Sequence, residues 1–150
     1  MYTRPPRSFL AFLTLMCLAA DAQVVSPAQI KQIEEIAQTI ASEHNRKSAS
    51  LNDNITVSSR ATAIGRNVRI ENVLRVKKGL SSAKRKEFSD ETRREVASQA
   101  CAVNAKNPAF DRGLSYTFTY FNTYGELLAE FTVDKAVCSN QRVKSSLSGG

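Results

Sequence analysis

Side chains that could perform catalysis are few in this sequence and lie far apart. His44 is the only histidine, so it is the only histidine that could act as the base of a Ser-His-Asp or Cys-His site. We expect it to interact with the last carbonyls of the helix on which it falls. Asp111, Glu126 and Glu130 flank a predicted hairpin, but no pattern directs two of these carboxylates to one point.

Motifs for nucleophilic serine, zinc protease, phosphate-loop and dinucleotide chemistry are absent from the sequence. No cluster of His, Cys and carboxylate residues has the spacing of metal ligands. The sequence therefore favours a protein that is not an enzyme and that uses no metal and no cofactor.

The N-terminal segment has the three parts of a secretory signal peptide. Arg4 and Arg7 give a basic start, residues 9–20 form an apolar run too short to span a bilayer, and an Ala-Asp-Ala cleavage site ends at Ala22. Lipid attachment at Cys17 is one alternative, although a methionine stands where a small residue is wanted, and an uncleaved anchor is another. We expect cleavage after Ala22 and an exported protein, either periplasmic or secreted.

Removal of such a peptide leaves two cysteines, Cys101 and Cys138. Disulfides form and persist in exported proteins, and a bridge across this loop adds about 3–4 kcal/mol in the chain-entropy model. Two unconnected buried thiols are the alternative. A redox role would call for the Cys-x-x-Cys spacing, which these two cysteines do not have. We predict a structural disulfide between Cys101 and Cys138.

The chain is basic, with a formal net charge of +7. This balance favours acidic partners, membrane head groups or nucleic acid without specifying any of them. A dense group of cations lies in a predicted loop over residues 77–86, and phosphate-rich polymers bind such groups through counterion release. A solvated loop between a strand and a helix is the simpler interpretation. The candidate anion-binding residues are Lys77, Lys78, Lys84, Arg85 and Lys86.

Aromatic residues gather between positions 116 and 124, where they could form a stacking surface for single-stranded nucleic acid. Their alternation with polar residues instead places Tyr116, Phe118 and Tyr120 on one face, which is typical of core packing. Phe121 and Tyr124 fall at the tip of the predicted hairpin, where we expect them to be exposed. They are the candidate residues for contact with a protein partner.

Hydrophobic periodicity predicts the elements that position these residues. A capping box formed by Ser26 and Gln29 opens the first helix. The predicted order is α-β-β-α-β-β, with helices over 27–44 and 89–104 and hairpin strands over 55–63, 66–76, 114–120 and 127–134.

This order predicts an α+β fold of two layers, a four-stranded antiparallel sheet with both helices on its apolar face. The other sheet face would be wet. The domain organisation we expect is a signal peptide over 1–22, a single α+β domain over 23–138 and a disordered tail over 139–150. The wet face would carry Arg60, Arg69, Arg75, Ser115, Thr117, Thr119 and Thr132.

A capped helix, two strands, a helix ending in a cysteine, the hairpin from Asp111 to Val133 and a final cysteine form a recognisable layout. Over residues 27–138 it resembles the pilotin-like (AspS-like) domains of type II secretion and the BspC-like exported effectors of Brucella. The resemblance implies a small antiparallel sheet with helices and one disulfide, and a role in binding another protein. Pilotins are typically lipoproteins, and the absence of a credible lipid-attachment site here places an outer-membrane escort role in doubt.

Two functions from different classes follow from these observations. The first is a non-enzymatic exported bacterial protein that binds a protein partner, in the cell envelope or as a secreted effector. The alternative is a basic module that binds nucleic acid or anionic lipid through the 77–86 loop. The sequence names neither the partner nor the oligomeric state.

Overall fold

The computed structural model describes residues 25–48 and 53–140, so the predicted signal peptide and positions 141–150 of the predicted tail lie outside the described residues. Residues 135–140, which include the first two positions of that tail, are helical. The other elements are α1 (Pro27–Ser48), β1 (Thr56–Ile64), β2 (Asn67–Leu74), α2 (Ser82–Asn104), α3 (Pro108–Asp111), β3 (Ser115–Asn122) and β4 (Leu127–Val133).

The strands form one sheet in the order β1-β2-β3-β4. The α+β class and the order of the elements are confirmed, but the sheet is mixed rather than wholly antiparallel. β1 pairs with β2 and β3 with β4 in antiparallel fashion, whereas β2 and β3 are parallel, with Val68 opposite Tyr116. The reason is that α2 carries the chain back along the sheet, so that β3 starts at the end where β2 started.

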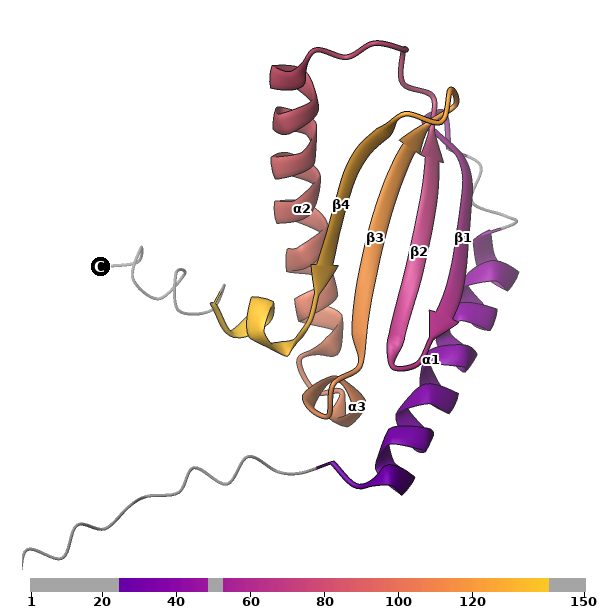
Figure 1. The fold of residues 1–150 in the computed structure, drawn as a ribbon, viewed down its shortest axis with the longest axis vertical. Helices are drawn as coiled ribbons and strands as arrows, with labels where there is room; N and C mark the ends of the chain where they lie inside the picture. The colour runs from indigo at the N-terminus through magenta and orange to yellow at the C-terminus, as the bar shows by residue number, and fades with distance from the viewer. Residues whose placement is uncertain (1–24, 49–52, 141–150) are drawn as a thin grey trace, which may run out of the picture.

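Both helices cover the same face of the sheet, as the alternation predicted. Val68, Tyr116 and Val133 stand opposite one another across three strands and therefore share a face. Ile33, Ala37 and Ala41 of α1 pack with Val68, while Ala97 of α2 packs with Val133; the partly buried Tyr116 contacts both clusters. Figure 1 shows α1 beside β1 and α2 beside β4.

The opposite sheet face is polar, as predicted, although Thr119, which was expected to be wet, is buried there. Glu130 Oε2 accepts hydrogen bonds from Thr119 Oγ1 at 3.0 Å and from Arg69 Nη2 at 3.4 Å. Thr117 Oγ1 and Thr132 Oγ1 lie 3.0 Å apart in a further cross-strand hydrogen bond. Polar side chains of neighbouring strands thus form hydrogen bonds with one another across this face.

The start of α1 agrees with its capping box, because Ser26 Oγ accepts from the backbone N–H of Gln29 at 3.3 Å and Gln29 Oε1 accepts from that of Ser26 at 2.9 Å. Its end at Ser48 lies beyond the predicted boundary at 44. The helix continues past residue 44 because His44 and Asn45 form hydrogen bonds with β1, which hold this part of the chain against the sheet.

The predicted start of the second helix, at residue 89, is wrong. α2 begins at Ser82, because Ser81 supplies an N-cap whose Oγ accepts from the backbone N–H of Lys84 at 3.3 Å. Asn107 and Pro108 follow this helix and start α3. The Asn107 side chain accepts from the Ala109 N–H at 3.0 Å, and Pro108 occupies the first turn, where proline is favoured.

A disulfide joins Cys101 of α2 to Cys138 in the helical segment after β4, which confirms the predicted pairing. The two Cα atoms are 5.3 Å apart, and the cysteines are separated by 37 positions in the sequence. The bridge fixes the end of α2 to the chain that leaves β4, so one covalent bond closes the loop that contains α3, β3 and β4.

Replacing both Cys101 and Cys138 with serine should lower the free energy of unfolding by about 3–4 kcal/mol, because the unfolded chain gains the entropy of an open loop. Urea unfolding followed by circular dichroism measures this change. Ala102→Ser, an exposed substitution in the same helix, is the control and should have little effect. A loss for the double variant no larger than that of the control would contradict the prediction.

Asn45 covers the outer edge of the sheet at β1. Its side-chain amide donates to the Ala61 carbonyl at 2.8 Å and accepts from the Ala61 N–H at 2.7 Å. An added strand would make the same pair of hydrogen bonds to Ala61. The side chain therefore takes the place of a neighbouring strand at the centre of β1.

Asn45→Ala should destabilise the protein by roughly 1–3 kcal/mol, because both backbone groups of the buried Ala61 lose their partner. Thermal unfolding gives the stability change, and hydrogen exchange at the Ala61 amide reports the local opening. Ser42→Ala, exposed on the same helix, is the matched control. Unchanged exchange at Ala61 in Asn45→Ala would show that this amide is protected by something else.

Candidate functional site

The single histidine is part of a polar chain between α1 and the sheet. Ser59 Oγ donates to Asn72 Oδ1 at 2.7 Å and lies 2.8 Å from His44 Nε2. Because the serine proton is directed to Asn72, His44 donates to Ser59 and does not act as its base. Partial burial lowers the pKa of His44. The expectation that His44 caps its own helix is corrected, since its ring reaches across to β1.

The turn between β3 and β4 is organised by Asn122, which is 1% exposed. Its Oδ1 accepts from the backbone N–H groups of Tyr124 at 3.0 Å and Glu126 at 2.9 Å, and its Nδ2 donates to Glu126 Oε2 at 2.6 Å. The Gly79 N–H donates to the same Glu126 oxygen at 3.0 Å. This carboxylate therefore ties the hairpin turn to the loop between β2 and α2.

The two predicted aromatic contact residues differ in exposure. Tyr124 lies in the turn with 63% of its surface exposed. Phe121 belongs to β3, pairs with Leu127 and is half-buried, so it is less available than its predicted place at the tip implied. A β-bulge between Tyr120 and Phe121 shifts the register there.

The predicted basic residues divide between two elements. Lys77 and Lys78 lie in the loop after β2, whereas Lys84, Arg85 and Lys86 lie in the first two turns of α2, so they are not all in one loop as expected. Lys86 forms an ion pair with Asp90 one turn further along α2. In Figure 1 this loop and the β3–β4 turn lie at the same end of the sheet.

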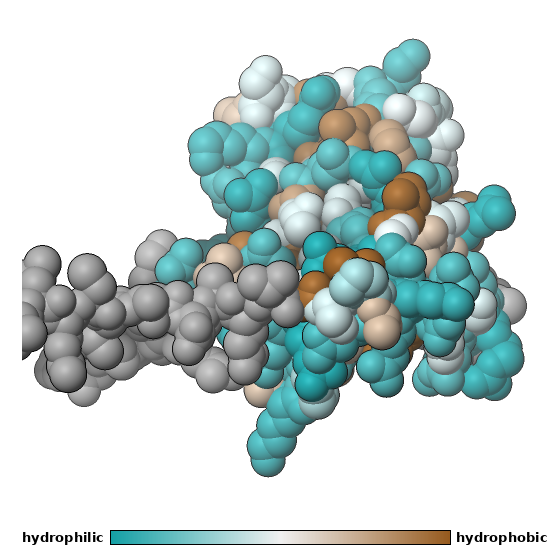
Figure 2. All heavy atoms as spheres, turned by 60° about the horizontal axis from the view of Figure 1, so that its bottom comes forward, coloured by the Kyte–Doolittle hydropathy of each residue, from teal (hydrophilic) through white to brown (hydrophobic). Residues whose placement is uncertain are grey.

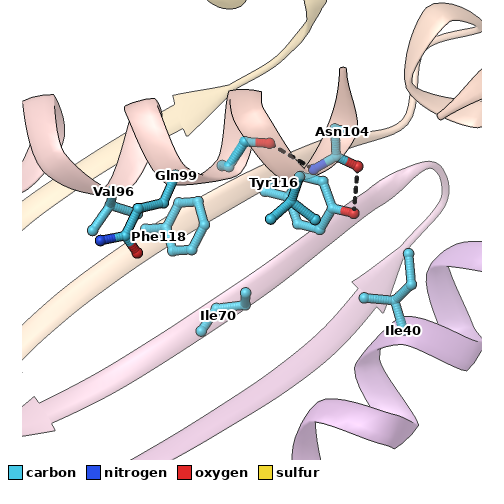
Figure 3. Close-up of a pocket in the computed structure, with 9 residues that line it drawn as sticks. Ile40, Ile70, Val96, Gln99, Asn104, Tyr116 and Phe118 are labelled. Carbon is cyan, nitrogen blue, oxygen red and sulfur yellow. Dashed lines mark hydrogen bonds between the residues drawn. The ribbon is translucent and has the colours of Figure 1, made fainter. Parts of the chain in front are cut away.

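A groove lies between α1 and α2, over the parallel pair β2 and β3 (Figure 3), and we name it the inter-helix groove. Its volume is about 330 Å³, and Val103 at its rim is 82% exposed. Tyr116 donates from its hydroxyl to Asn104 Oδ1 at 3.3 Å, and Asn104 Nδ2 donates to the Ala100 carbonyl at 2.9 Å. The lining consists of Ile40, Ile70, Val96, Gln99, Ala100, Val103, Asn104, Tyr116 and Phe118.

Asn104 and the Tyr116 hydroxyl are already engaged and Gln99 is the remaining polar side chain of the lining, so the groove presents mainly apolar surface. Burial raises the pKa of Tyr116, although its hydrogen bond to Asn104 acts in the opposite direction. Burial, with a smaller contribution from Glu95, raises the pKa of the neighbouring Tyr120 to about 12. The phenols here are therefore neutral at physiological pH, and the groove suits apolar groups.

Sequence reasoning did not identify this groove. Val96 and Ala100 of α2 pack against the core cluster of β3 and β4 and, with Asn104, also line the gap between the helices. The sequence signal that could have indicated the groove is the small size of the residues on this face of α2, where larger core side chains are usual. None of the predicted site residues lines the groove.

Within residues 25–48 and 53–140, no group of three or more His, Cys, Asp or Glu side chains could hold a metal ion. No helix in that same part of the chain is both long and apolar enough to cross a membrane. Figure 2 shows the surface from the end that is lowest in Figure 1: it is largely hydrophilic, with small and separate hydrophobic patches.

Glu126 provides a pH-dependent contact at the hairpin end. Its pKa is lowered by the hydrogen bond from the Gly79 N–H and that from Asn122, with help from the positive charges of Arg85 and Lys78. A carboxylate whose pKa is lower in the folded than in the unfolded protein stabilises the fold above its unfolded pKa. That contribution disappears as the pH falls through the folded pKa.

Wild-type protein should therefore lose stability below about pH 4 more steeply than Glu126→Gln, which has no carboxylate to protonate. Melting temperatures measured across the acid range test this difference. Glu87→Gln is the control, because Glu87 is exposed and makes no hydrogen bond to a described residue. Parallel pH profiles for wild type and Glu126→Gln would exclude the proposed role of the carboxylate.

Comparison with solved structures places the fold among pilotins. The chain is similar to the type II secretion system pilotin AspS from Vibrio cholerae, with 24% identity and a TM-score of 0.55 over 74% of this chain and 96% of that chain. It is also similar to the pilotin EpsS from the Vibrio vulnificus type 2 secretion system, with 20% identity and a TM-score of 0.57 over 75% and 97%.

A proposed secreted protein from Pseudomonas aeruginosa has the same fold, with 12% identity and a TM-score of 0.59 over 75% of this chain and 98% of that chain. No protein-family model and no curated protein matches the sequence. At these identities the likeness concerns the fold, and the expected pilotin-like architecture is confirmed: this chain has the fold of the type II secretion pilotins.

Proposed function

We propose that this chain is an exported, non-enzymatic protein that binds an apolar helical segment of a protein partner in the inter-helix groove. The observation that carries the proposal is the groove itself, an apolar depression bounded by two helices with the exposed Val103 at its rim. Amphipathic helices dock into grooves of this kind through a few apolar side chains on one face.

The size of the groove supports a peptide segment as the occupant. A volume of about 330 Å³ is at the small end of the range of ligand pockets, which suits a few side chains. Gln99, exposed beside the groove, can accept or donate hydrogen bonds to the backbone or polar residues of that segment. The partner would thus present aliphatic side chains at helical spacing.

The pilotin fold supports a role in protein binding within a secretion machine. The two similar Vibrio structures are pilotins of type II secretion systems, so we infer that the partner is a component of such a machine or of a related envelope assembly. Export is supported by the predicted signal peptide, and the disulfide agrees with an oxidising compartment. We therefore place the protein in the periplasm or among the secreted proteins.

Photo-crosslinking from the groove tests the proposal directly. A photo-reactive amino acid at position 103 should crosslink to a defined envelope protein, whereas the same amino acid at position 102 should not. Ala102 is exposed on the same helix and does not line the groove. The crosslinked segment, identified by mass spectrometry, is then synthesised as a peptide, and its affinity for the protein is measured.

Val103→Glu should weaken binding of that peptide by roughly tenfold or more, because a charge would be buried against apolar side chains. Ala102→Glu is the matched control and should bind as wild type does. Equal crosslinking from both positions would exclude the groove. Binding that depends strongly on salt and is lost on charge reversal of Lys77, Lys78, Lys84, Arg85 and Lys86 would instead favour the alternative, anion binding at that end of the fold.

A further inference from the structure

The two edges of the sheet differ in how they are protected. β1 is one edge, and the side-chain amide of Asn45 occupies the hydrogen-bonding position beside Ala61 at its centre. β4 is the other edge. Every second residue of an edge strand directs its backbone N–H and C=O away from the sheet. In the described part of the chain, no side chain or backbone group forms a hydrogen bond to the outward backbone groups of β4.

A long groove follows this open edge. Two hollows of about 470 and 500 Å³ succeed each other between α2 and β4, and we name them together the edge groove. The first is lined on the strand side by Leu127 to Glu130, and the second by Phe131 and Thr132. The groove therefore runs beside almost the whole of β4, along its open edge.

The wall that faces β4 is basic. Arg85 and Lys86 line the first hollow, and Arg93 and Arg94 line the second. The guanidinium of Arg93 lies 5.7 Å from the centroid of the Phe131 ring, a cation–π contact that holds this charge beside the strand.

The acids of the edge groove neutralise this wall only in part, since the lining has four cations and only two acids, Asp90 and Glu130. Asp90 is paired with Lys86, and Glu130 is paired with Arg69 from the polar sheet face. Arg85, Arg93 and Arg94 form no ion pair with a carboxylate of the described residues. The groove thus combines an unpaired strand edge with an excess of positive charge.

We propose that the edge of β4 binds an extended, acidic segment of a partner protein as a fifth strand of the sheet. Backbone hydrogen bonds would supply the affinity, as in other cases of strand addition. Carboxylates on alternate residues would face the arginines of α2. This site is separate from the inter-helix groove, and its occupation does not depend on the function proposed there.

The chemistry of the groove argues against two other occupants. Residues 141–150 of this chain contain Arg142 and Lys144 but no acid, so their charge has the same sign as the wall. A second copy paired through β4 would bring two basic walls towards one another. An acidic partner segment is free of both repulsions.

Binding of two fluorescent peptides tests the proposal, one alternating glutamate with valine and one alternating lysine with valine. The glutamate peptide should bind to the purified, oxidised full chain, and the lysine peptide should not. In hydrogen exchange measured by NMR, every second amide of β4 should become protected on addition of the glutamate peptide. This alternating pattern is specific for strand pairing.

The double variant Arg85→Glu and Arg94→Glu should bind the glutamate peptide roughly tenfold more weakly, because two charges of the wall become repulsive. Lys31→Glu combined with Lys106→Glu is the control, since it makes the same change of net charge at exposed positions outside the edge groove. Val103→Glu should bind the peptide normally, which separates this site from the inter-helix groove.

Four results would overturn the proposal. The first is failure of the glutamate peptide to bind at millimolar concentration, and the second is equal binding of the lysine peptide. The third is unchanged affinity in the arginine variant when circular dichroism shows that it is folded. The fourth is protection of the outward β4 amides in the absence of peptide. Protection at every protein concentration would identify this chain's own tail as the occupant. Protection that appears only at high protein concentration would identify a second copy.

Discussion

Hydrogen bonds between the parallel strands β2 and β3 join two units that each consist of a helix followed by a hairpin. α1 packs on β1 and β2, and α2 packs on β4, so each helix packs mainly against the hairpin that follows it. The parallel seam is possible because α2 spans the length of the sheet between the two strands. It places both helices on one face and leaves a depression between them, above the seam, where the inter-helix groove lies.

Tyr116 shows how the seam couples the two halves. It stands opposite Val68 across the seam and opposite Val133 on its other side, and it packs against both hydrophobic clusters. Its hydroxyl is held by Asn104 near the end of α2. A side chain that fills the core and also lines the groove makes the shape of the groove dependent on the packing of both halves.

Amide side chains complete the backbone hydrogen bonding where regular structure stops. Asn45 replaces a strand beside β1, and Asn122 closes the β3–β4 turn together with Glu126. Unsatisfied buried backbone groups are costly, so such residues fix edges and turns as firmly as apolar packing fixes the core. β4 lacks an equivalent partner among the described residues, and this asymmetry is the basis for assigning a binding role to that edge.

The sequence by itself determined the α+β class, the order of the elements, the polar and apolar faces and the Cys101–Cys138 disulfide, because alternation, capping residues and cysteine number are local or countable properties. Only the tertiary structure decided that the central strands are parallel, that Ser81 starts α2, and that Phe121 is half-buried. It also decided where Asn45 and Asn122 find their partners. The hydrogen bonds of Ser81 and Asn122 are local, but the parallel seam and the partner of Asn45 depend on contacts between residues distant in sequence. Both candidate grooves arise from such distant contacts: one between two helices, the other between α2 and an unpaired strand edge.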